Sequence, residues 1–448
     1  MKKNLHSIVS VALLICLLFL AACQNTSETS ESSESSSVTP STSETEEEIT
    51  LVFWDMAWGS DVYYDAMNDL IVQFETENPG IKIDYQTLTW DGYVQNFTAA
   101  VASDSGPDFS TGGGSLQHLM AEMGEILYLD DIIAEWEKTG EINDFPAGSL
   151  ESMRYDGHQI GIPWNYDPLV LFYNIEHFEA AGIEKIPTNS NELYEALVKL
   201  KEAGYGGLTT DVLYSWCSMA FWQLFAFDLA EEEGTVGFYK DGEVLVNTKA
   251  GIEAFAFIRK LADEGLISQA IASYDNPDAT KDFVQGNSSI LFENINVESV
   301  ARESNPELLD KIGIMKPFAT GIGNPSNQIM GFSDTKYPEE TMKAIAWFSA
   351  HEAPLFTDTG LAQYPVRISI ANDSAIQDRW QIDVIVNEVL PLGKAYGYPN
   401  ESLFPEFQTI MGNNIMVNAV QRAILTDDPV EDIAAEVQTE IEKIMAGS

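Results

Sequence analysis

The sequence predicts an α/β fold, in which a parallel sheet is covered by helices on its faces. Three observations predict it. Apolar, β-rich runs alternate with stretches of helical periodicity, the connections between them are short, and the alternation continues along the chain. Such alternation favours parallel strands joined by helices that pack back onto the sheet.

The first elements follow from local composition. ITLVFW at 49–54 predicts a buried strand, and apolar residues recur at helical spacing within 60–80, at Val62, Met67, Leu70, Ile71 and Phe74. NPG at 78–80 ends that helix. A second strand is expected at 81–87, a second helix at 90–104 and a third strand at 106–110. Later segments repeat the pattern: we expect helices at 191–204, 249–265, 338–352 and 428–445, and a strand at 288–294.

Length and charge limit the function. The chain has 448 residues, which suffices for two domains with their own cores. With 23 basic and 70 acidic residues, its formal charge is −47. A surface this acidic repels phosphate backbones and anionic headgroups, so it excludes nucleic acid binding. The charge suits a soluble monomer with neutral or cationic ligands.

The N-terminus predicts export. Residues 1–22 carry Lys2 and Lys3 before an apolar run, as in a secretory signal peptide. The run ends in LAAC at 20–23, which resembles the lipobox of bacterial lipoproteins. By that resemblance, Cys23 is lipidated and becomes the mature N-terminus, with two acyl chains as a stable anchor. An ordinary secreted protein, cut after small residues, is the alternative.

A linker follows the predicted anchor. Residues 24–48 hold seven Glu and neither Lys, Arg nor an aromatic residue, so 23–48 is expected to be a disordered, lipid-anchored linker. No later apolar run reaches the roughly 18 residues of a membrane span, so the lipid would be the only membrane contact. These features place the folded part at the extracellular face of the cytoplasmic membrane. Cys217 is the only cysteine left there, and we expect it to be a small buried hydrophobe.

The middle of the chain resembles a known family. RYDGHQIGIPWNYDPLVLFYNIEHFEAAGI at 154–183 and PTNSNELYEALVKL at 187–200 resemble the central signature of bacterial extracellular solute-binding proteins that serve sugar ABC importers. That family includes the maltose-binding proteins. Further segments resemble family elements in the same order: FETENPGIKIDY, GPDF, ILYLDDI, FVQGNSSILFEN and AIAWFSAHEAPLFTDTGLAQYPVR.

The resemblance implies a two-lobed, periplasmic-binding-protein-like fold of type II, with a ligand cleft between lobes that several crossing segments join. We expect residues 49–165 with 333–378 in the first lobe and residues 166–332 with 379–448 in the second. The implied function is capture of a carbohydrate, foremost an oligosaccharide, and its delivery to the permease subunits of an ABC importer. No cofactor is implied.

Candidate ligand residues follow from sugar chemistry. A sugar needs a flat aromatic surface beside forked donors and acceptors. In parallel sheets ligands bind at the carboxyl ends of strands, where the sequence places Asp55, Trp58, Trp90, Gly113 and Ser115. Trp58 could instead belong to the core. GGGS at 112–115 lacks the GK[ST] of a phosphate loop, so we expect a turn that lets the ligand approach the backbone.

Other candidates depend on the resemblance. It places WNYD at 164–167 where the chain crosses between lobes, which makes Trp164, Asn165 and Asp167 candidates, although Trp164 could plug the lobe interface. In the second lobe the candidates are Trp216, from a stretch in which at least one of Tyr214, Trp216 and Trp222 is core, and Glu293 and Asn294, which follow a strand. Gly331 would lie at the second crossing. Arg367 could fork onto hydroxyls or a carboxylate, or form a structural ion pair.

Enzyme motifs are absent. HExxH, GxSxG and CxxC do not occur, the histidines are scattered, and no calcium loop is present, so we predict neither catalysis nor a metal site. Two alternatives stay open. A surface-anchored polysaccharide-degrading enzyme would need two carboxylates at a set separation, which an acidic chain always offers. A ligand-presenting sensor or adhesin would use the same lobes.

Overall fold

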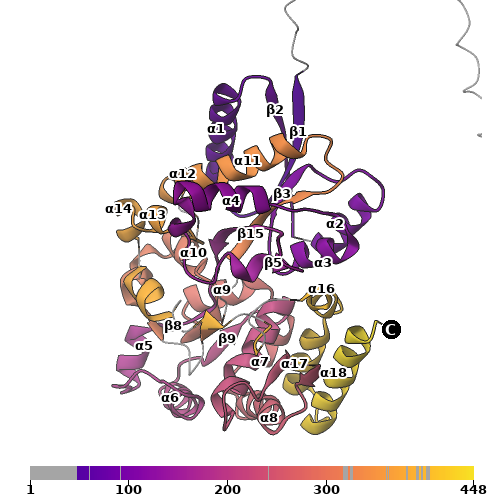
Figure 1. Ribbon diagram of the computed structural model, residues 1–448. Coiled ribbons are helices and arrows are strands. Elements are labelled where there is room, and N and C mark those ends of the chain that lie inside the picture. The colour runs from indigo at the N-terminus through magenta and orange to yellow at the C-terminus, as the bar shows by residue number, and fades with distance from the viewer. Residues whose placement is uncertain are drawn as a thin grey trace, which may run out of the picture. The chain divides into compact units, whose positions relative to one another are not determined.

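The computed structural model describes residues 48–447 apart from positions 60, 91, 241, 316–320, 323–325, 360, 362, 380–381, 390–392, 395–396 and 400–403. The predicted signal peptide, the lipidation site Cys23 and the linker, except Glu48, lie outside the described residues. Residues 47–448 form one compact unit, in which two sheets organise an upper and a lower lobe (Figure 1). Within the described residues, no helix combines the length and apolar character that crossing a bilayer would require.

The first lobe is built on a mixed sheet. Its strand order is β16-β7-β15-β3-β1-β2, with β4 also paired to β15. β1 runs parallel to β2 and β3, as predicted, whereas β15 runs antiparallel to β3, β4 and β7. The strands are β1 (Ile49–Met56), β2 (Ile81–Leu88), β3 (Phe109–Gly112), β4 (Ile126–Leu127), β7 (Ile162–Tyr166), β15 (Ser326–Phe332) and β16 (Tyr364–Pro365).

Helices cover this sheet. Figure 1 shows α11, which is late in the chain, beside the indigo α1 in the upper lobe. The helices are α1 (Asp61–Glu77), α2 (Tyr93–Val101), α3 (Leu116–Met123), α4 (Asp130–Thr139), α11 (Pro338–His351), α12 (Ala353–Thr357), α13 (Ile368–Ala371), α14 (Ser374–Gln377) and α15 (Ile382–Val384). Short 3-10 turns η1 (Glu141–Asp144) and η2 (Glu151–Met153) and the hairpin β5 (Arg154–Tyr155) and β6 (His158–Gln159) complete the lobe.

The core of the first lobe forms where α1 and α11 meet the sheet. Phe53 stacks on Phe109 with ring centroids 4.4 Å apart, and Phe348 of α11 packs against both rings. The predicted apolar stripe of α1 is correct except at its start. Tyr63 is buried there, whereas Val62 is 53% exposed, because the helix turns the preceding position toward solvent.

The second lobe has its own sheet, in the order β13-β8-β12-β9, with β12 antiparallel to β8 and parallel to β9. Its strands are β8 (Val170–Asn174), β9 (Leu208–Thr210), β12 (Ile290–Glu293) and β13 (Ile312–Met315). Its helices are α5 (Ile175–Ala180), α6 (Ser190–Glu202), α7 (Ser215–Leu229), α8 (Lys249–Asp263), α9 (Asn276–Val284), α10 (Val297–Ser304), α16 (Pro405–Gly412), α17 (Ile415–Leu425) and α18 (Val430–Met445). The predicted helices at 191–204, 249–265, 338–352 and 428–445 are therefore confirmed.

Smaller elements connect these helices and strands. They are η3 (Gln269–Ser273), η4 (Pro306–Lys311), the π-helical η5 (Ile385–Val389), the pair β10 (Gly237–Lys240) and β11 (Glu243–Leu245), and the pair β14 (Gly321–Ile322) and β17 (Gly393–Lys394). Helix α7 lies in the middle of the second lobe's core. Its Trp222 is fully buried, and the indole nitrogen donates to the Gly251 carbonyl at 3.0 Å.

The chain crosses between the two sheets where β7 gives way to β8, after Tyr166. The later boundaries differ from the expectation. β15 belongs to the first sheet, so the chain has returned by Ser326 and not at 333. Ile382 and Ile385 still pack in the first lobe's core, so the first lobe also extends beyond residue 378. Both differences arise because sheet and core membership depend on distant partners.

Arg367 is a structural residue of the first lobe, so its predicted ligand role is wrong and the ion-pair alternative holds. It is 3% exposed, and its guanidinium donates to Glu141 at 2.9 Å, Asp144 at 3.2 Å and Ser349 at 3.2 Å. The group also lies over the Phe145 ring, 4.6 Å from its centroid. These contacts tie η1 to α11 and to the start of α13.

Replacing Arg367 by Met should therefore lower stability and leave ligand affinity unchanged. Removing one partner of a buried ion pair costs about 3 kcal/mol, and urea denaturation would measure the loss. Arg302→Met is the matched control. Arg302 pairs with Glu298 but is 60% exposed, so its loss should cost less than about 1 kcal/mol. Equal effects of the two substitutions would contradict the structural role of Arg367.

Candidate functional site

A cavity of about 1460 Å³ lies between the two lobes. Its walls come from the carboxyl ends of β1, β2 and β3 in the first lobe and of β9 and β12 in the second. This placement follows the general rule for open α/β sheets, in which side chains beyond the strand ends are free to meet a ligand.

Aromatic residues form the first lobe's wall. The rings of Trp58 and Trp90 pack edge to face with centroids 4.9 Å apart, and Tyr93 packs in the same manner on Trp90 at 5.1 Å. The Trp90 indole nitrogen donates to the Ala57 carbonyl at 3.1 Å, which fixes the ring at the cavity. Together these rings offer a rigid apolar surface with few rotatable bonds.

A buried network behind this wall positions Trp58. The Thr111 hydroxyl donates to Asp55 Oδ1 at 2.5 Å and accepts the Trp58 indole N–H at 3.0 Å. The Tyr85 hydroxyl donates to Asp55 Oδ2 at 2.9 Å. Burial raises the pKa of Asp55 to about 6, although these hydrogen bonds oppose the shift. Asp55 therefore supports the wall from behind and does not line the cavity.

The glycine-rich loop after β3 brings the lobes into contact. Gly114 has φ +68°, which favours glycine, and a Cβ there would lie 2.6 Å from Cζ2 of Trp216 in the second lobe. The Gln408 amide, on α16, lies against the same loop. Its nitrogen is 3.3 Å from the Gly113 carbonyl, and with the amide turned over its oxygen would accept the N–H groups of Ser115 and Leu116. Side chains of the second lobe therefore approach the backbone of this loop closely, whereas the sequence predicted that a ligand would approach it.

The second lobe's wall starts from the N-terminus of α7. Trp216 lines the cavity and packs on Phe407, with centroids 5.5 Å apart, while Tyr214 is 47% exposed beside it. Trp222 is the core member of this stretch. Trp216 therefore lines the cavity while Trp222 is core, and ligand binding by Trp216 stays a prediction.

Three carboxyl groups gather at the second lobe's side of the cavity. Asp167 lies in the crossing segment, Asp211 follows β9, and Glu293 ends β12. The Cys217 thiol donates to Glu293 Oε1 at 3.6 Å, and the Asn294 N–H donates to the same oxygen at 2.9 Å. Burial raises the pKa of Asp167 to about 6, of Asp211 to about 7 and of Glu293 to about 8, and Asp211 raises the last further.

One group of described side chains is compact enough to hold a metal ion. Single ligand atoms of Asp211, Cys217 and Glu293 lie within 4.8 Å of one another, all buried. The sequence predicted Cys217 to be a plain hydrophobe. It is buried as expected, but its thiol also serves as a hydrogen-bond donor to a carboxyl group.

The structure brings some of the predicted ligand residues to the cavity. Those that line it are Trp58, Trp90, Gly113, Asp167, Trp216 and Asn294. A second set is buried and lies one layer behind: Asp55, Ser115, Asn165 and Glu293. Asn165, for example, accepts at 2.6 Å from Asn327, which does line the cavity. Ligand contact by any of these residues stays a prediction.

Two further predicted residues lie elsewhere. Trp164 is fully buried in the first lobe's core and does not line the cavity, because β7 points this side chain into the lobe. Gly331 lies inside β15, where a Cβ would be 2.9 Å from the Leu127 side chain, so it serves strand packing and not a crossing. Their predicted places at the ligand surface are wrong.

Sequence reasoning missed several lining residues. Asp211, Tyr93, Asn327 and Gln363 all line the cavity. Asp211 directly follows β9, so the strand-end rule would have found it had that short strand been recognised. Asn327 lies in β15 and Gln363 directly precedes β16. Both strands pair with segments that are distant in sequence, and no local signal marks the two residues.

Comparisons with known proteins agree with this geometry. Residues 58–353 match the family model of the bacterial extracellular solute-binding protein. A binding protein of Brucella abortus is 26% identical over 284 residues, which are 61% of this chain and 65% of that protein, so the match spans just under two thirds of its length. The diacetylchitobiose binding protein DasA of Streptomyces coelicolor is 22% identical over 409 residues, 89% of this chain and 90% of DasA.

Solved structures share the fold. A sugar transporter from Arthrobacter chlorophenolicus A6 with bound laminaribiose has a TM-score of 0.78 and 24% identity, covering 88% of this chain and 99% of that one. The sugar-binding protein MalE from Xanthomonas citri has a TM-score of 0.72 and 17% identity, covering 89% and 98%. The α/β, two-lobed fold predicted from the sequence is therefore confirmed.

The buried carboxyl groups predict a pH-dependent stability. Asp211 and Glu293 have folded pKa values of about 7 and 8, whereas unfolded carboxyl groups titrate near pH 4. Between the unfolded and the folded pKa of each group, the folded state binds more protons than the unfolded state. The free energy of unfolding without ligand should therefore fall as pH rises from 5 to 8, by up to about 1.4 kcal/mol per pH unit for each group. Urea denaturation across this range measures the slope.

The variant Glu293→Gln should flatten that slope. Glu307→Gln, which removes an exposed carboxylate on η4, should leave it unchanged. If Glu293→Gln keeps the slope of the unaltered protein, the buried carboxyl group is not the source of the pH dependence.

Proposed function

The chain belongs to the bacterial extracellular solute-binding proteins, and from this premise we propose that it captures a carbohydrate, foremost an oligosaccharide, in the cleft between its lobes. The observation that carries the proposal is the pairing of aromatic walls with polar groups across the cavity. Trp58, Trp90 and Trp216 offer faces for the C–H surfaces of sugar rings, and Asp167, Asn294 and Asn327 offer groups for hydroxyls.

The size of the cavity supports a ligand of more than one ring. Its volume of about 1460 Å³ exceeds the roughly 300–1,000 Å³ typical of sites for drug-sized ligands. The relatives point the same way, since DasA is named for diacetylchitobiose and the Arthrobacter structure holds laminaribiose.

Capture would work by closure of the lobes. Because both lobes contribute walls, a sugar that contacts both favours the closed arrangement by its differential affinity. A micromolar ligand supplies about 8 kcal/mol, which suffices to hold closure that costs a few kcal/mol. The loaded, monomeric protein would then dock on the permease subunits of an ABC importer, tethered to the outer face of the cytoplasmic membrane through Cys23. Family membership and the N-terminal sequence support these steps.

A thermal-shift screen of the full chain against mono- and oligosaccharides, polyols and amino acids tests the function. A ligand at 100 times its dissociation constant adds about 2.7 kcal/mol, so the matching sugar should raise the melting temperature by a few degrees. Chromatography should recover the sugar intact. Recovery of fragments would contradict binding without catalysis, and a panel in which no sugar shifts the melting temperature would contradict the carbohydrate assignment.

Two tryptophan variants locate the binding surface. Trp216→Ala should raise the dissociation constant about tenfold, or about 1.4 kcal/mol, because a stacking surface is lost. Trp347→Ala is the matched control. Trp347 lies on α11, outside the cavity, and its indole donates to Glu77 at 2.8 Å. Equal affinity losses in both variants would place the ligand outside this cleft.

A further inference from the structure

The cavity displays hydrogen-bond acceptors that have no donor. Among its described lining residues, two buried carboxyl oxygens and one buried amide oxygen are without a partner: Asp167 Oδ1, Asp211 Oδ2 and Gln363 Oε1. Asp211 is 1% exposed and Gln363 8% exposed. Gln363 comes from the first lobe, and its amide nitrogen reaches Asp167 Oδ2 at 3.5 Å, so this acceptor joins the carboxyl groups from the opposite wall. Buried acceptors without donors are costly, so their ligand should be rich in donors.

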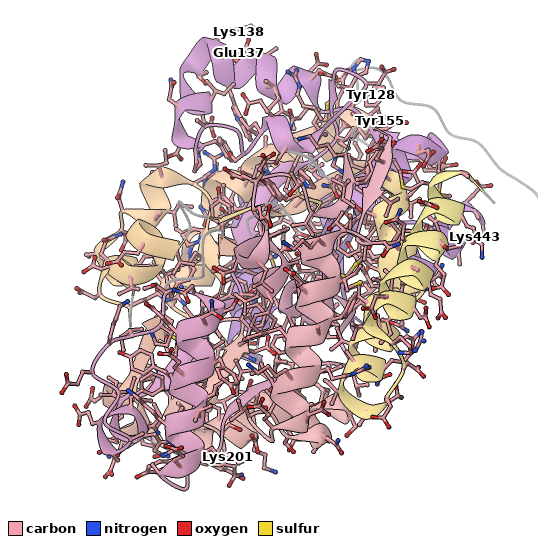
Figure 2. All side chains as sticks on the ribbon, turned by 90° about the horizontal axis from the view of Figure 1, so that it is seen from below. Tyr128, Glu137, Lys138, Tyr155, Lys201 and Lys443 are labelled. Atoms are coloured by element: carbon pink, nitrogen blue, oxygen red, sulfur yellow. The ribbon has the colours of Figure 1, made fainter. Side chains whose placement is uncertain are left out.

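Among the described residues, no cationic side chain pairs with the carboxyl groups at this end of the cavity. None of the ion pairs among the described residues involves Asp167, Asp211 or Glu293. Arg302, the cationic side chain among the described lining residues, is bonded to Glu298 at 2.6 and 3.0 Å. Figure 2 shows three further cationic side chains, Lys138, Lys201 and Lys443, at the periphery of the molecule. The carboxyl groups are therefore uncompensated by the described protein.

We propose that this acidic end of the cavity receives a protonated amine, so that the preferred ligand is a saccharide with a free amino group. The inference rests on the proposed carbohydrate function and specifies its ligand class. An ammonium group carries three donors and one positive charge, which suits two unpartnered carboxyl oxygens and one unpartnered amide oxygen at this end of the cavity. The rest of the saccharide would extend along Trp90 and Trp216.

A metal ion is the competing occupant, since Asp211, Cys217 and Glu293 are close enough to hold one. Metal binding at this group would need the thiolate of Cys217. Burial and the neighbouring Glu293 raise the pKa of that thiol well above its usual range, and the thiol already donates to Glu293. An ammonium needs no such deprotonation, and it also uses Asp167 and Gln363, which lie outside the metal-sized group.

The test compares matched sugars by isothermal titration of the full chain at pH 7. The probes are glucosamine, N-acetylglucosamine and glucose, together with their β-1,4-linked dimers to tetramers. The amine-bearing member of each set should bind at least tenfold more tightly than its acetylated and hydroxyl counterparts. Its affinity should fall at least threefold from pH 7 to pH 5.5, because Asp167 and Asp211, whose pKa values burial raises to about 6 and about 7, lose negative charge over this range. Besides the three carboxyl groups, the titratable groups that face this end of the cavity are Tyr214, Cys217 and Asp275. Their titration would change the affinity for all the sugars alike, so it does not affect the comparison between them.

Variants separate local charge from the general acidity of the chain. Asp211→Asn should reduce the preference for the amine to less than threefold, and Asp310→Asn, which removes an exposed carboxylate on η4, should retain it. Should Asp211→Asn fail to fold, the pH dependence of the unaltered chain still decides. Tighter binding of a neutral sugar would overturn the amine inference while leaving carbohydrate capture intact. Binding of none of the sugars would overturn both, and Zn²⁺ binding reversed by a chelator and lost in Cys217→Ser would assign the group to a metal.

Discussion

The pairing of β15 with β3 on one side and β7 on the other holds the architecture together. β7 is the last strand of the first sheet before the chain enters the second lobe, and β15 is the first strand after it returns. Their antiparallel hydrogen bonds close the first lobe around both ends of the segment that builds the second. This pairing fixes where the chain crosses between the lobes. As a result, the strand ends of the two sheets face each other across the cavity. The aromatic wall and the acidic group each depend on that placement.

Features governed by local periodicity were accessible from the sequence, and features governed by distant partners were not. The stripe of α1 and the place of Trp58 and Trp90 follow from helical spacing and strand ends. Arg367 was ambiguous because its partner Asp144 lies 223 residues away. Gly331 was misplaced since its strand pairs with segments from the beginning of the chain. Residues 208–210 consist of one Leu and two Thr, too little apolar pattern to reveal β9 and, with it, Asp211.

The cleft carries an energetic cost of its own in the empty protein. Buried acceptors without donors and carboxyl groups without cations destabilise the empty protein, and a ligand that satisfies them removes the cost on binding. The well-packed cores beside α7 and α11 offset this burden. A binding protein gains from such an arrangement, because the same unsatisfied groups that weaken the empty state distinguish a matching solute from one that lacks donors.

The contact between Gly114 and Trp216 has a mechanical consequence. The Gly114 backbone of the first lobe lies directly against the Trp216 indole of the second lobe. The absence of a side chain at residue 114 therefore sets how closely the two lobes approach at this contact. A methyl group there would collide with the Trp216 ring and would hold the two lobes further apart at this point. The size of residue 114 would therefore limit how completely the lobes close, and through closure it would affect how long a solute is retained.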